Sequence, residues 1–424
     1  MKNKKLLIPI IAVLLLIVII IVTVILLSGN KYTDAQPTAS LNAVLTYEQA
    51  EEDLAFMYDA VKKNHPCYLD GSELYKTFDI AYEKAKEKLK GYDIITVRDL
   101  WETGAEMYCS LKDGHTLITF YNSKQILESE KLSDGEIISV DGIERAELLS
   151  KFRCFFPCEP QVDFYVDYML DEALKLESWN TLLGVDTSDG ITIVIGNETG
   201  VEALECTFGY PEATLSDDSG TAAEAFYSYE FYDDKSSAVF KLDKCELTDG
   251  YKSALESFFK EVNEKGITRV AVDLRENGGG NSMVINEFMK YIDIESYCVF
   301  GGNIVRTGEN LIENKGYVEK NKKSKYAFSG ELYALTSNYT FSSGMDFAVT
   351  ISDNKIGKVI GEIPGNMPTS YGDKLYFQPP NSKLLCNVSY KKFYRVDRNK
   401  DDIPLIPDIE SDEKNALDIF LNSD

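Results

Sequence analysis

Histidine is scarce in this chain, and positive charge is outweighed by negative charge. Only His65 and His115 occur among its 424 residues, so three imidazoles of one chain cannot hold a metal ion, and the sequence implies neither a metal nor an organic cofactor. Lys and Arg number 44 against 69 Asp and Glu, which gives a formal net charge of −25. This excess of acid repels phosphate backbones, so we expect no nucleic acid partner.

The longest glycine run lacks the features of a nucleotide site. Residues 278–280 are three consecutive glycines directly after the apolar stretch 270–274. No Walker lysine follows them, and no Gly-x-Gly-x-x-Gly is formed, so nucleotide binding is disfavoured. Glycines allow a sharp turn that directs backbone N–H groups at an anion. The run therefore suits an oxyanion hole.

The N-terminus carries a long uncharged segment. Lys2, Lys4 and Lys5 precede residues 6–27, a run of 22 residues without a charged side chain. About 20 apolar residues span a bilayer, whereas the core of a cleavable signal peptide has about 7–15. We expect residues 1–27 to be an uncleaved signal anchor at the cell membrane, with the N-terminus cytoplasmic and the body extracellular. A long signal peptide that is removed is the alternative.

Pattern changes divide the rest of the chain into four parts. The first is a polar linker, and the second holds three amphipathic helical patterns, of which the first opens with a Thr46-x-x-Gln49 capping box. The third is a mixed β region whose segment 136–149 resembles the last strand and helix of a PDZ module. The fourth is an α/β domain. The predicted ranges are 28–42, 43–112, 113–221 and 222–424, with helices at 46–61, 73–89 and 96–111 and small-region strands at 136–140, 191–195 and 203–208.

Strands and helices alternate in the last part. We expect strands at 238–242, 270–274, 331–335 and 358–360, and helices at 251–265, from 282, and at 343–351. Such alternation predicts right-handed crossovers and an α/β sheet covered on both faces. The chemistry of such a sheet is found at the C-terminal ends of its strands.

Two short segments carry residues suited to catalysis. Ser342 and Ser343 follow the strand 331–335 where a helix starts, which is a favoured position for a capping serine but also presents a hydroxyl beside free N–H donors. His115 lies in an Asp-Gly-His-Thr loop where a helix gives way to a strand. His65, in Asn-His-Pro, suits the C-terminus of a helix.

Several motifs in fixed order suggest a family. They are DGHT at 113–116, VAVDLRENGGG at 270–280, TSNYTFSSGMDFAVTISDNKIGKVIGE at 336–362, PTSYGD at 368–373 and LIPDIE at 405–410. Together they resemble the serine peptidases of the C-terminal processing (tail-specific) family. The resemblance covers roughly residues 222–410 and implies an α/β catalytic domain of the crotonase-like, ClpP-like type.

The general base distinguishes two branches of that family. In one branch a lysine lies about 25 residues after the serine, but Met367 stands at that offset here and Lys374 is out of place. The other branch, which includes tricorn core and interphotoreceptor retinoid-binding protein-like peptidases, uses a histidine from a loop such as Asp-Gly-His-Thr. This sequence is closer to the second branch and supplies His115.

The resemblance also implies roles for other residues. The nucleophile falls on Ser342, the base on His115 and the orienting acid on Asp401, with Asp402 as its competitor. The oxyanion donors implied are the backbone N–H groups of Gly278, Gly279 and Ser343. Met345 and Asp346 replace the family's usual glutamate after the serine.

The resulting prediction is a membrane-anchored extracellular serine endopeptidase with a polypeptide substrate. The alternative is a catalytically inactive module of the same fold that binds peptides or lipid, motivated by Met345 and by the 26 Tyr and 21 Phe. Eight cysteines permit disulfides in an oxidising location, but the sequence assigns no pairing. The oligomeric state and the cleavage specificity stay open.

Overall fold

The computed structural model describes residues 35–127, 132, 135–197, 200–210 and 226–422. The predicted membrane segment, residues 6–27, lies outside this range, as does the predicted boundary at 221. Across the described ranges, no helix has both the length and the apolar character needed to cross a bilayer.

The three predicted N-terminal helices are confirmed. They are α2 (Tyr47–Asn64), α3 (Leu74–Lys90) and α4 (Val97–Cys109). Thr46 caps α2, and its hydroxyl accepts from the Gln49 N–H while the Gln49 side chain accepts from the Thr46 N–H, which is the predicted capping box. The buried faces of the helices meet in one core, where Leu54, Phe78 and Trp101 are completely buried.

The mixed region contains a small antiparallel sheet and more helix than the sequence predicted. Its four-stranded sheet has the order β6-β5-β7-β8, and Asp141 and Gly142, both at positive φ, form the turn between β5 and β6. The strands are β5 (Glu136–Val140), β6 (Ile143–Glu144), β7 (Ile191–Asn197) and β8 (Gly200–Cys206), and the helices are α5 (Arg145–Phe152), α6 (Tyr165–Leu174) and α7 (Glu177–Leu183). Of the three helices, only α5 was predicted.

The C-terminal part has the predicted α/β sheet, with six strands in the order β10-β11-β12-β17-β18-β21. All neighbours pair in parallel except β10 and β11. The strands are β10 (Tyr227–Tyr232), β11 (Ser237–Leu242), β12 (Arg269–Asp273), β17 (Glu331–Thr336), β18 (Gly357–Gly361) and β21 (Ile409–Glu410).

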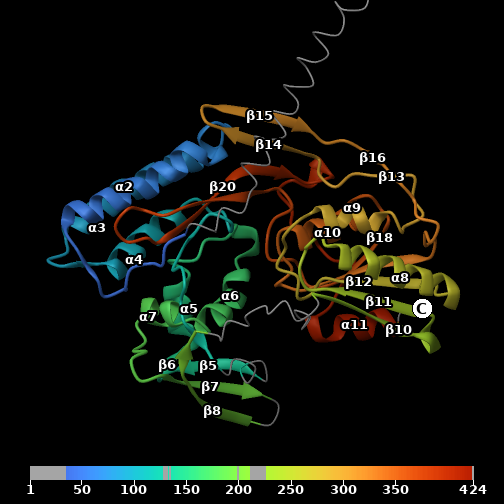
Figure 1. The fold of residues 1–424 in the computed structure, drawn as a ribbon, viewed down its shortest axis with the longest axis horizontal. Helices are drawn as coiled ribbons and strands as arrows, with labels where there is room; N and C mark the ends of the chain where they lie inside the picture. The colour runs from blue at the N-terminus through green and yellow to red at the C-terminus, as the bar shows by residue number, and fades with distance from the viewer. Residues whose placement is uncertain (1–34, 128–131, 133–134, 198–199, 211–225, 423–424) are drawn as a thin grey trace, which may run out of the picture.

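Helices cover both faces of this sheet. On one face lie α8 (Asp249–Lys265), α9 (Met283–Met289) and α10 (Ser343–Asp353), and on the other lies α11 (Glu413–Asn422) (Figure 1). Along β12, Val270 and Val272 pack on the first face while Ala271 packs on the second. Both faces of the strand are therefore buried, which explains its continuous apolar sequence.

A second sheet, which the sequence did not predict, joins the two halves of the molecule. Its order is β15-β14-β20-β19, and the short strand β3 also pairs with β20. The strands are β3 (Ile118–Thr119), β14 (Gly302–Thr307), β15 (Asn310–Lys315), β19 (Ser370–Phe377) and β20 (Leu385–Tyr394). Figure 1 shows β20 running from α2 toward α10. Cys386 and Val388 of β20 lie in the core of the N-terminal helices.

Three pairs of two-residue strands complete the described fold. They are β1 (Val44–Leu45) with β2 (Ile95–Thr96), β4 (Gln125–Ile126) with β9 (Phe208–Gly209), and β13 (Ser296–Tyr297) with β16 (Glu319–Lys320).

A buried ion pair fixes the end of β20 to the helix α10. The Arg395 guanidinium donates to both carboxylate oxygens of Asp353, at 2.8 and 2.9 Å, and the two side chains are 3% and 0% exposed. Asp353 is the last residue of α10. Bidentate geometry strengthens these hydrogen bonds, and burial makes the loss of either partner costly.

We predict that Asp353→Asn lowers the free energy of unfolding by about 3–5 kcal/mol, because it leaves the buried Arg395 charge without its partner. Urea denaturation followed by circular dichroism measures the change. Asp59→Asn is the control, since Asp59 pairs with Lys63 on the surface and the expected loss is below about 1 kcal/mol. Equal losses in the two variants would contradict the prediction.

Candidate active site

Ser342 stands between the parallel sheet and α10, in a backbone conformation that is unusual for serine. Its φ is 52° and its ψ is −126°, whereas side chains other than glycine rarely adopt positive φ. It occupies the N-cap position of α10, yet its side chain makes no capping hydrogen bond. The structure thus favours the nucleophile over the capping interpretation. Strain of this kind costs about 1–3 kcal/mol and is found mainly at functional sites.

Two neighbours hold Ser342 in this conformation. The Ser342 N–H donates to the Asn366 Oδ1 at 2.7 Å. Gly279, at φ +98°, passes so close that a Cβ there would lie 2.7 Å from the Ser342 Cβ. Only glycine fits this approach, which gives the predicted glycine run a structural reason.

His115 meets Ser342 as the sequence predicted. The His115 Nε2 lies 3.1 Å from the Ser342 Oγ, although 227 residues separate them in the chain. The ring is 6% exposed, and the ring of Phe341 packs against it with 4.7 Å between centroids. Burial lowers the pKa of His115 to about 4, and the negative charge of Asp113 opposes this only in part. The imidazole is therefore neutral at neutral pH and able to accept a proton.

Asp113 is the carboxylate beside this imidazole. Its Oδ1 accepts from the His115 backbone N–H at 2.9 Å and lies 3.8 Å from the His115 Nδ1. Its Oδ2 receives the hydroxyls of Thr116 and Ser389, at 2.6 and 2.7 Å, and the His65 Nε2 at 3.2 Å. Burial alone would raise the pKa of Asp113, but the hydrogen bond from His65, with the other donors, holds this pKa well below its usual range. The group is therefore ionised.

His65 has a role that its local sequence did not reveal. It is the C-cap residue of α2, as its context suggested, but its fully buried side chain turns toward Asp113. Its Nδ1 accepts the Cys67 N–H at 3.2 Å, so its Nε2 carries the proton that it donates to Asp113. The two partners are 48 residues apart, and the sequence pattern contains no signal for such a contact.

The structure does not bring the expected acid, Asp401, to His115. The Asp401 carboxylate accepts from the Thr369 hydroxyl at 2.7 Å and from the Arg398 Nε at 2.8 Å. Asp402 is exposed. Asp113, inside the same motif as His115, lies nearest to the imidazole among the three acids, because its carboxylate accepts from the His115 backbone N–H.

The expected oxyanion donors are shifted by one residue. The Gly279 N–H donates to the Asn277 Oδ1 at 2.8 Å, so it is not free to bind an oxyanion. Gly278 packs against Tyr339, where a Cβ would lie 2.9 Å from the phenol oxygen. Gly280 and Ser343 line the cleft beside Ser342. The glycine of the run that faces the site is thus Gly280.

The cleft around Ser342 and His115 has a volume of about 400 Å³. Aromatic side chains and polar groups share its wall, among them Phe300, Tyr371, Phe393, Asp373 and Lys391. Met345, at the place of the family glutamate, is 1% exposed in the core, whereas the next residue, Asp346, lines the cleft. Burial, helped by the charge of Asp373, raises the pKa of Asp346 well above its usual range.

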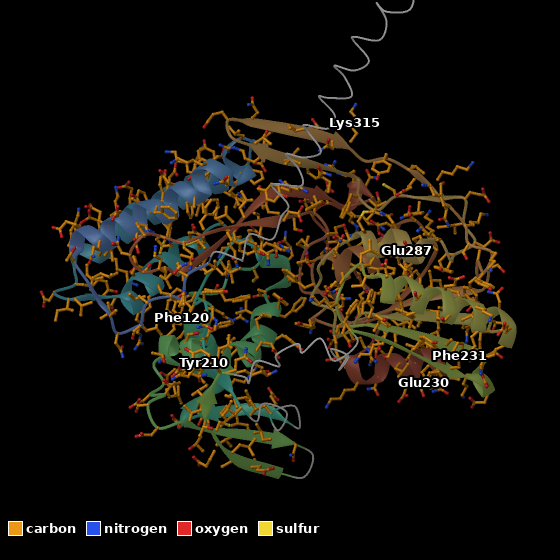
Figure 2. The ribbon with its side chains drawn as sticks, viewed as in Figure 1. Phe120, Tyr210, Glu230, Phe231, Glu287 and Lys315 are labelled. Atoms are coloured by element: carbon orange, nitrogen blue, oxygen red, sulfur yellow. The ribbon has the colours of Figure 1, made fainter. Side chains whose placement is uncertain are left out.

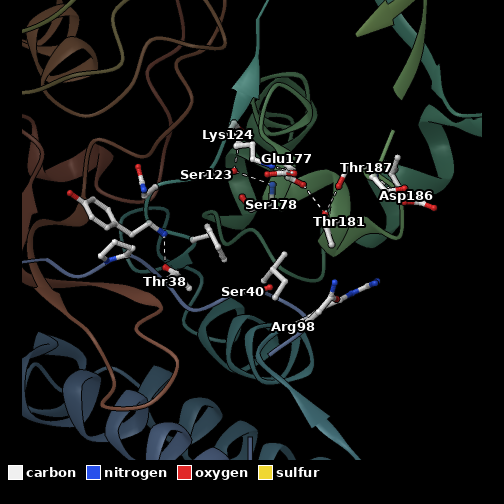
Figure 3. Close-up of a pocket in the computed structure, with 18 of the residues that line it drawn as sticks. Thr38, Ser40, Arg98, Ser123, Lys124, Glu177, Ser178, Thr181, Asp186 and Thr187 are labelled. Carbon is white, nitrogen blue, oxygen red and sulfur yellow. Dashed lines mark hydrogen bonds and ion pairs between the residues drawn. The ribbon is translucent and has the colours of Figure 1, made fainter. Parts of the chain in front are cut away.

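A larger cavity, of about 670 Å³, lies apart from this site (Figure 3). Its wall comes from the N-terminal segment, α4 and α7, and includes none of the residues around Ser342. Figure 2 shows two aromatic residues of this wall, Phe120 and Tyr210, in the N-terminal half. Three of the charged groups of the cavity are paired, because Arg98 contacts Glu102 and Lys124 contacts Glu177, and the Asp186 carboxylate accepts from the Ser188 N–H. We assign it no role in the chemistry.

The described residues contain no group of three or more His, Cys, Asp and Glu side chains placed to bind a metal ion. The eight cysteines are free thiols in this structure.

Comparison with known proteins agrees with this geometry. Residues 238–411, which include Ser342, match the model of peptidase family S41. Over this segment the chain is similar to peptidase family S41. The resemblance to the C-terminal processing peptidases is thereby confirmed, and no curated protein sequence matches the chain.

Solved structures extend the likeness beyond the matched segment. Mature CPAF in complex with lactacystin gives a TM-score of 0.64 at 12% identity, over 89% of this chain and 99% of that one. A candidate peptidase from Parabacteroides merdae gives 0.50 at 13% identity, over 89% and 98%. The photosystem II D1 C-terminal processing protease gives 0.49 at 14% identity, over 87% and 94%. At such identities the first two structures show a shared fold alone.

A second buried carboxyl lies next to the histidine loop of this site. Glu159 is 8% exposed, and a Cβ on Gly114 would lie 3.4 Å from its Oε2. Neither carboxyl oxygen has a hydrogen-bond partner among the described residues. Burial and the charge of Asp113 raise the pKa of Glu159 to about 8. Glu159 is therefore protonated at neutral pH.

We predict that Glu159→Gln removes a pH dependence of stability. Between pH 4.5 and about 8 the folded chain keeps a proton that the unfolded chain has released, so wild-type stability falls as pH rises through this window. The loss approaches about 1.4 kcal/mol per pH unit at most. A neutral glutamine cannot release a proton, so the variant lacks this loss of stability. Urea unfolding is therefore expected to show that the stability of the variant relative to wild type is greater at pH 8 than at pH 5.

Glu147→Gln is the control for this experiment, because Glu147 is an exposed acid paired with Lys151. It is expected to follow the wild type at both pH values. A constant difference between Glu159→Gln and wild type across the window would contradict the assignment of a protonated Glu159.

Proposed function

We propose that this chain is an endopeptidase in which Ser342 is the nucleophile, His115 the general base and Asp113 the carboxylate that supports it. Its match to family S41 supports a serine peptidase acting on polypeptides. The observation that carries the residue assignment is the 3.1 Å contact between the Ser342 Oγ and the His115 Nε2. A serine hydroxyl is a weak nucleophile, and a neutral imidazole at this distance activates it.

The first half of the reaction forms an acyl-enzyme. The Ser342 Oγ attacks the scissile carbonyl carbon while its proton passes to the His115 Nε2. The resulting oxyanion accepts hydrogen bonds from the backbone N–H groups of Gly280 and Ser343, each worth about 3 kcal/mol in the transition state. When the C–N bond breaks, the His115 imidazolium gives the proton to the leaving amine.

The second half releases the product. Water attacks the ester carbonyl and passes a proton to the His115 Nε2, and collapse of the intermediate returns this proton to the Ser342 Oγ. The new carboxylic acid leaves. The Nδ1 of His115 has no hydrogen-bond partner among the described residues, so the Asp113 charge at 3.8 Å is the nearest support for the transient imidazolium.

Asp113 suits this role because hydrogen bonds keep its carboxylate ionised. Its four donors keep it ionised although it is completely buried. They also fix its position, since Ser389 and Thr116 come from different elements. The imidazolium thus forms next to a fixed negative charge and needs no solvent to stabilise it.

We predict that Ser342→Ala abolishes labelling by a fluorophosphonate probe and lowers kcat/KM for an unstructured polypeptide by at least about 10⁴-fold. Asp113→Asn is expected to lower it by about 10²–10⁴-fold, because the imidazolium loses its counter-charge. Asp401→Asn is expected to lower it by less than about 10-fold. Probe labelling and the rate of peptide hydrolysis measure these effects.

Ser343→Ala serves as the control, because it removes the neighbouring hydroxyl but keeps the backbone donor, and it is expected to be labelled. A larger loss for Asp401→Asn than for Asp113→Asn would contradict the role of Asp113. Peptide or lipid binding by a wild-type chain without labelling or turnover would instead support the inactive binding module.

We further propose that residues 1–27 anchor the peptidase in the cell membrane with the catalytic body outside. The support is the 22-residue uncharged run after three lysines. The full chain is expected to stay with membranes during carbonate extraction, and protease added to intact cells is expected to remove the body. Deletion of residues 6–27 serves as the control and abolishes membrane retention. A mature chain that begins near residue 30 would show a cleaved signal peptide instead.

A further inference from the structure

A second cavity opens beside the catalytic cleft. It has a volume of about 540 Å³, and Ser282 and Phe300 line both it and the cleft around Ser342. Ser282 is two residues after Gly280, the last glycine of the run, which lines the cleft. A polypeptide held at Ser342 would therefore reach this cavity without crossing another part of the described surface.

The walls of this cavity carry apolar side chains that are open to solvent. Met283, at the start of α9, is 51% exposed, and Tyr317, just after β15, is 70% exposed. Val299 and Phe300 form the side toward the catalytic cleft. Large exposed apolar groups that converge on a concavity are typical of binding sites.

Close backbone packing fixes the position of these side chains. A Cβ on Gly316 would lie 2.5 Å from the Gly301 carbonyl carbon, so the segment before Tyr317 presses directly on the segment after Phe300. A side chain at position 316 has no room in this contact. The cavity is therefore a formed feature of the β14–β15 hairpin and its connections. In Figure 2, Lys315 on β15 and Glu287 on α9 mark the two elements that border it.

The two concavities differ in chemistry. The catalytic cleft presents Asp346, Asp373 and Lys391 around the reacting groups. In the second cavity, Glu313, Lys315 and Glu319 contribute to the lining together with the apolar side chains. Because the charges that line this cavity have both signs, they favour neither an acidic nor a basic ligand. An apolar side chain of a ligand would lose its contact with water when it enters the cavity, which favours binding.

We propose that this cavity is a specificity subsite that takes an apolar side chain of the polypeptide substrate, at a fixed position near the scissile bond. The inference rests on the proposed peptidase function of Ser342 and His115. Met283 and Tyr317 are its specificity-determining residues. Burial of one large apolar side chain accounts for a preference of about 10- to 100-fold in kcat/KM.

Two exposed positions offer the test, because their substitution leaves the core untouched. The variants are Met283→Asp and Tyr317→Asp, and an acid at the first turn of α9 is compatible with the helix. Ile312→Asp is the matched control, since Ile312 is also 51% exposed, lies on β15 and does not line the cavity. The substrates are peptides with leucine or aspartate placed in turn at each position on both sides of the cleaved bond.

In the wild type and the control variant we expect leucine to be preferred over aspartate at one position by at least about 10-fold in kcat/KM. Met283→Asp and Tyr317→Asp are expected to remove this preference at that position alone. Fluorophosphonate labelling of each variant reports separately whether the Ser342 site is intact.

Unchanged leucine preference in both variants, with normal labelling, would overturn the subsite and leave the peptidase function standing. An equal loss of preference in Ile312→Asp would also overturn it. A wild-type chain that is neither labelled nor able to cleave any peptide would overturn the proposed function, and the subsite with it.

Discussion

The buried Asp113 carboxylate is the contact on which the geometry of the site depends. It receives His65 at the end of α2, Thr116 in the histidine loop and Ser389 in β20, and so ties three segments to one charge. The β3–β20 pairing, which joins Ile118 to Cys386, continues the same junction. β20 belongs to the sheet next to α10, which begins beside Ser342. The contacts of Asp113 with β20 therefore hold His115 next to Ser342.

Two buried carboxyl groups next to the histidine loop show how hydrogen-bond donors determine whether a carboxyl group is ionised. Asp113 has four donors, and its pKa lies well below its usual range despite complete burial. Glu159, on the other side of Gly114, has no described partner, and its pKa rises to about 8. Repulsion between the two is avoided because only one of them is ionised at neutral pH. The single negative charge that remains is the one beside His115.

Local patterns predicted the elements that depend on neighbours in sequence. The three N-terminal helices and the parallel strands were predicted correctly because their periodicity is contained within short segments. The motifs singled out Ser342 and His115 in the same way, and the two side chains lie 3.1 Å apart. The sheet of β14, β15, β19 and β20 was missed because its pairing depends on distant contacts. Gly279 was predicted as an oxyanion donor because the sequence does not show that its N–H donates to the Asn277 side chain. Asp401 was predicted as the orienting acid because the motif does not show its contacts with Thr369 and Arg398.

Ser342 and His115, the proposed nucleophile and base, lie in different parts of the chain, so the proposed activity depends on how these parts associate. Ser342 is kept at positive φ by Asn366 and by the close approach of Gly279, all within the α/β part. His115 is kept in place by Asp113 and by the stack of Phe341 between its ring and that of Tyr165 in α6. Because β20 pairs with β3 and its Ser389 donates to Asp113, loss of these contacts would release His115 from its position beside Ser342. The strained conformation of Ser342 can therefore serve the proposed reaction only while the Asp113 contacts hold His115 in place. The stability of the contacts between β20 and the histidine loop is thus coupled to catalysis.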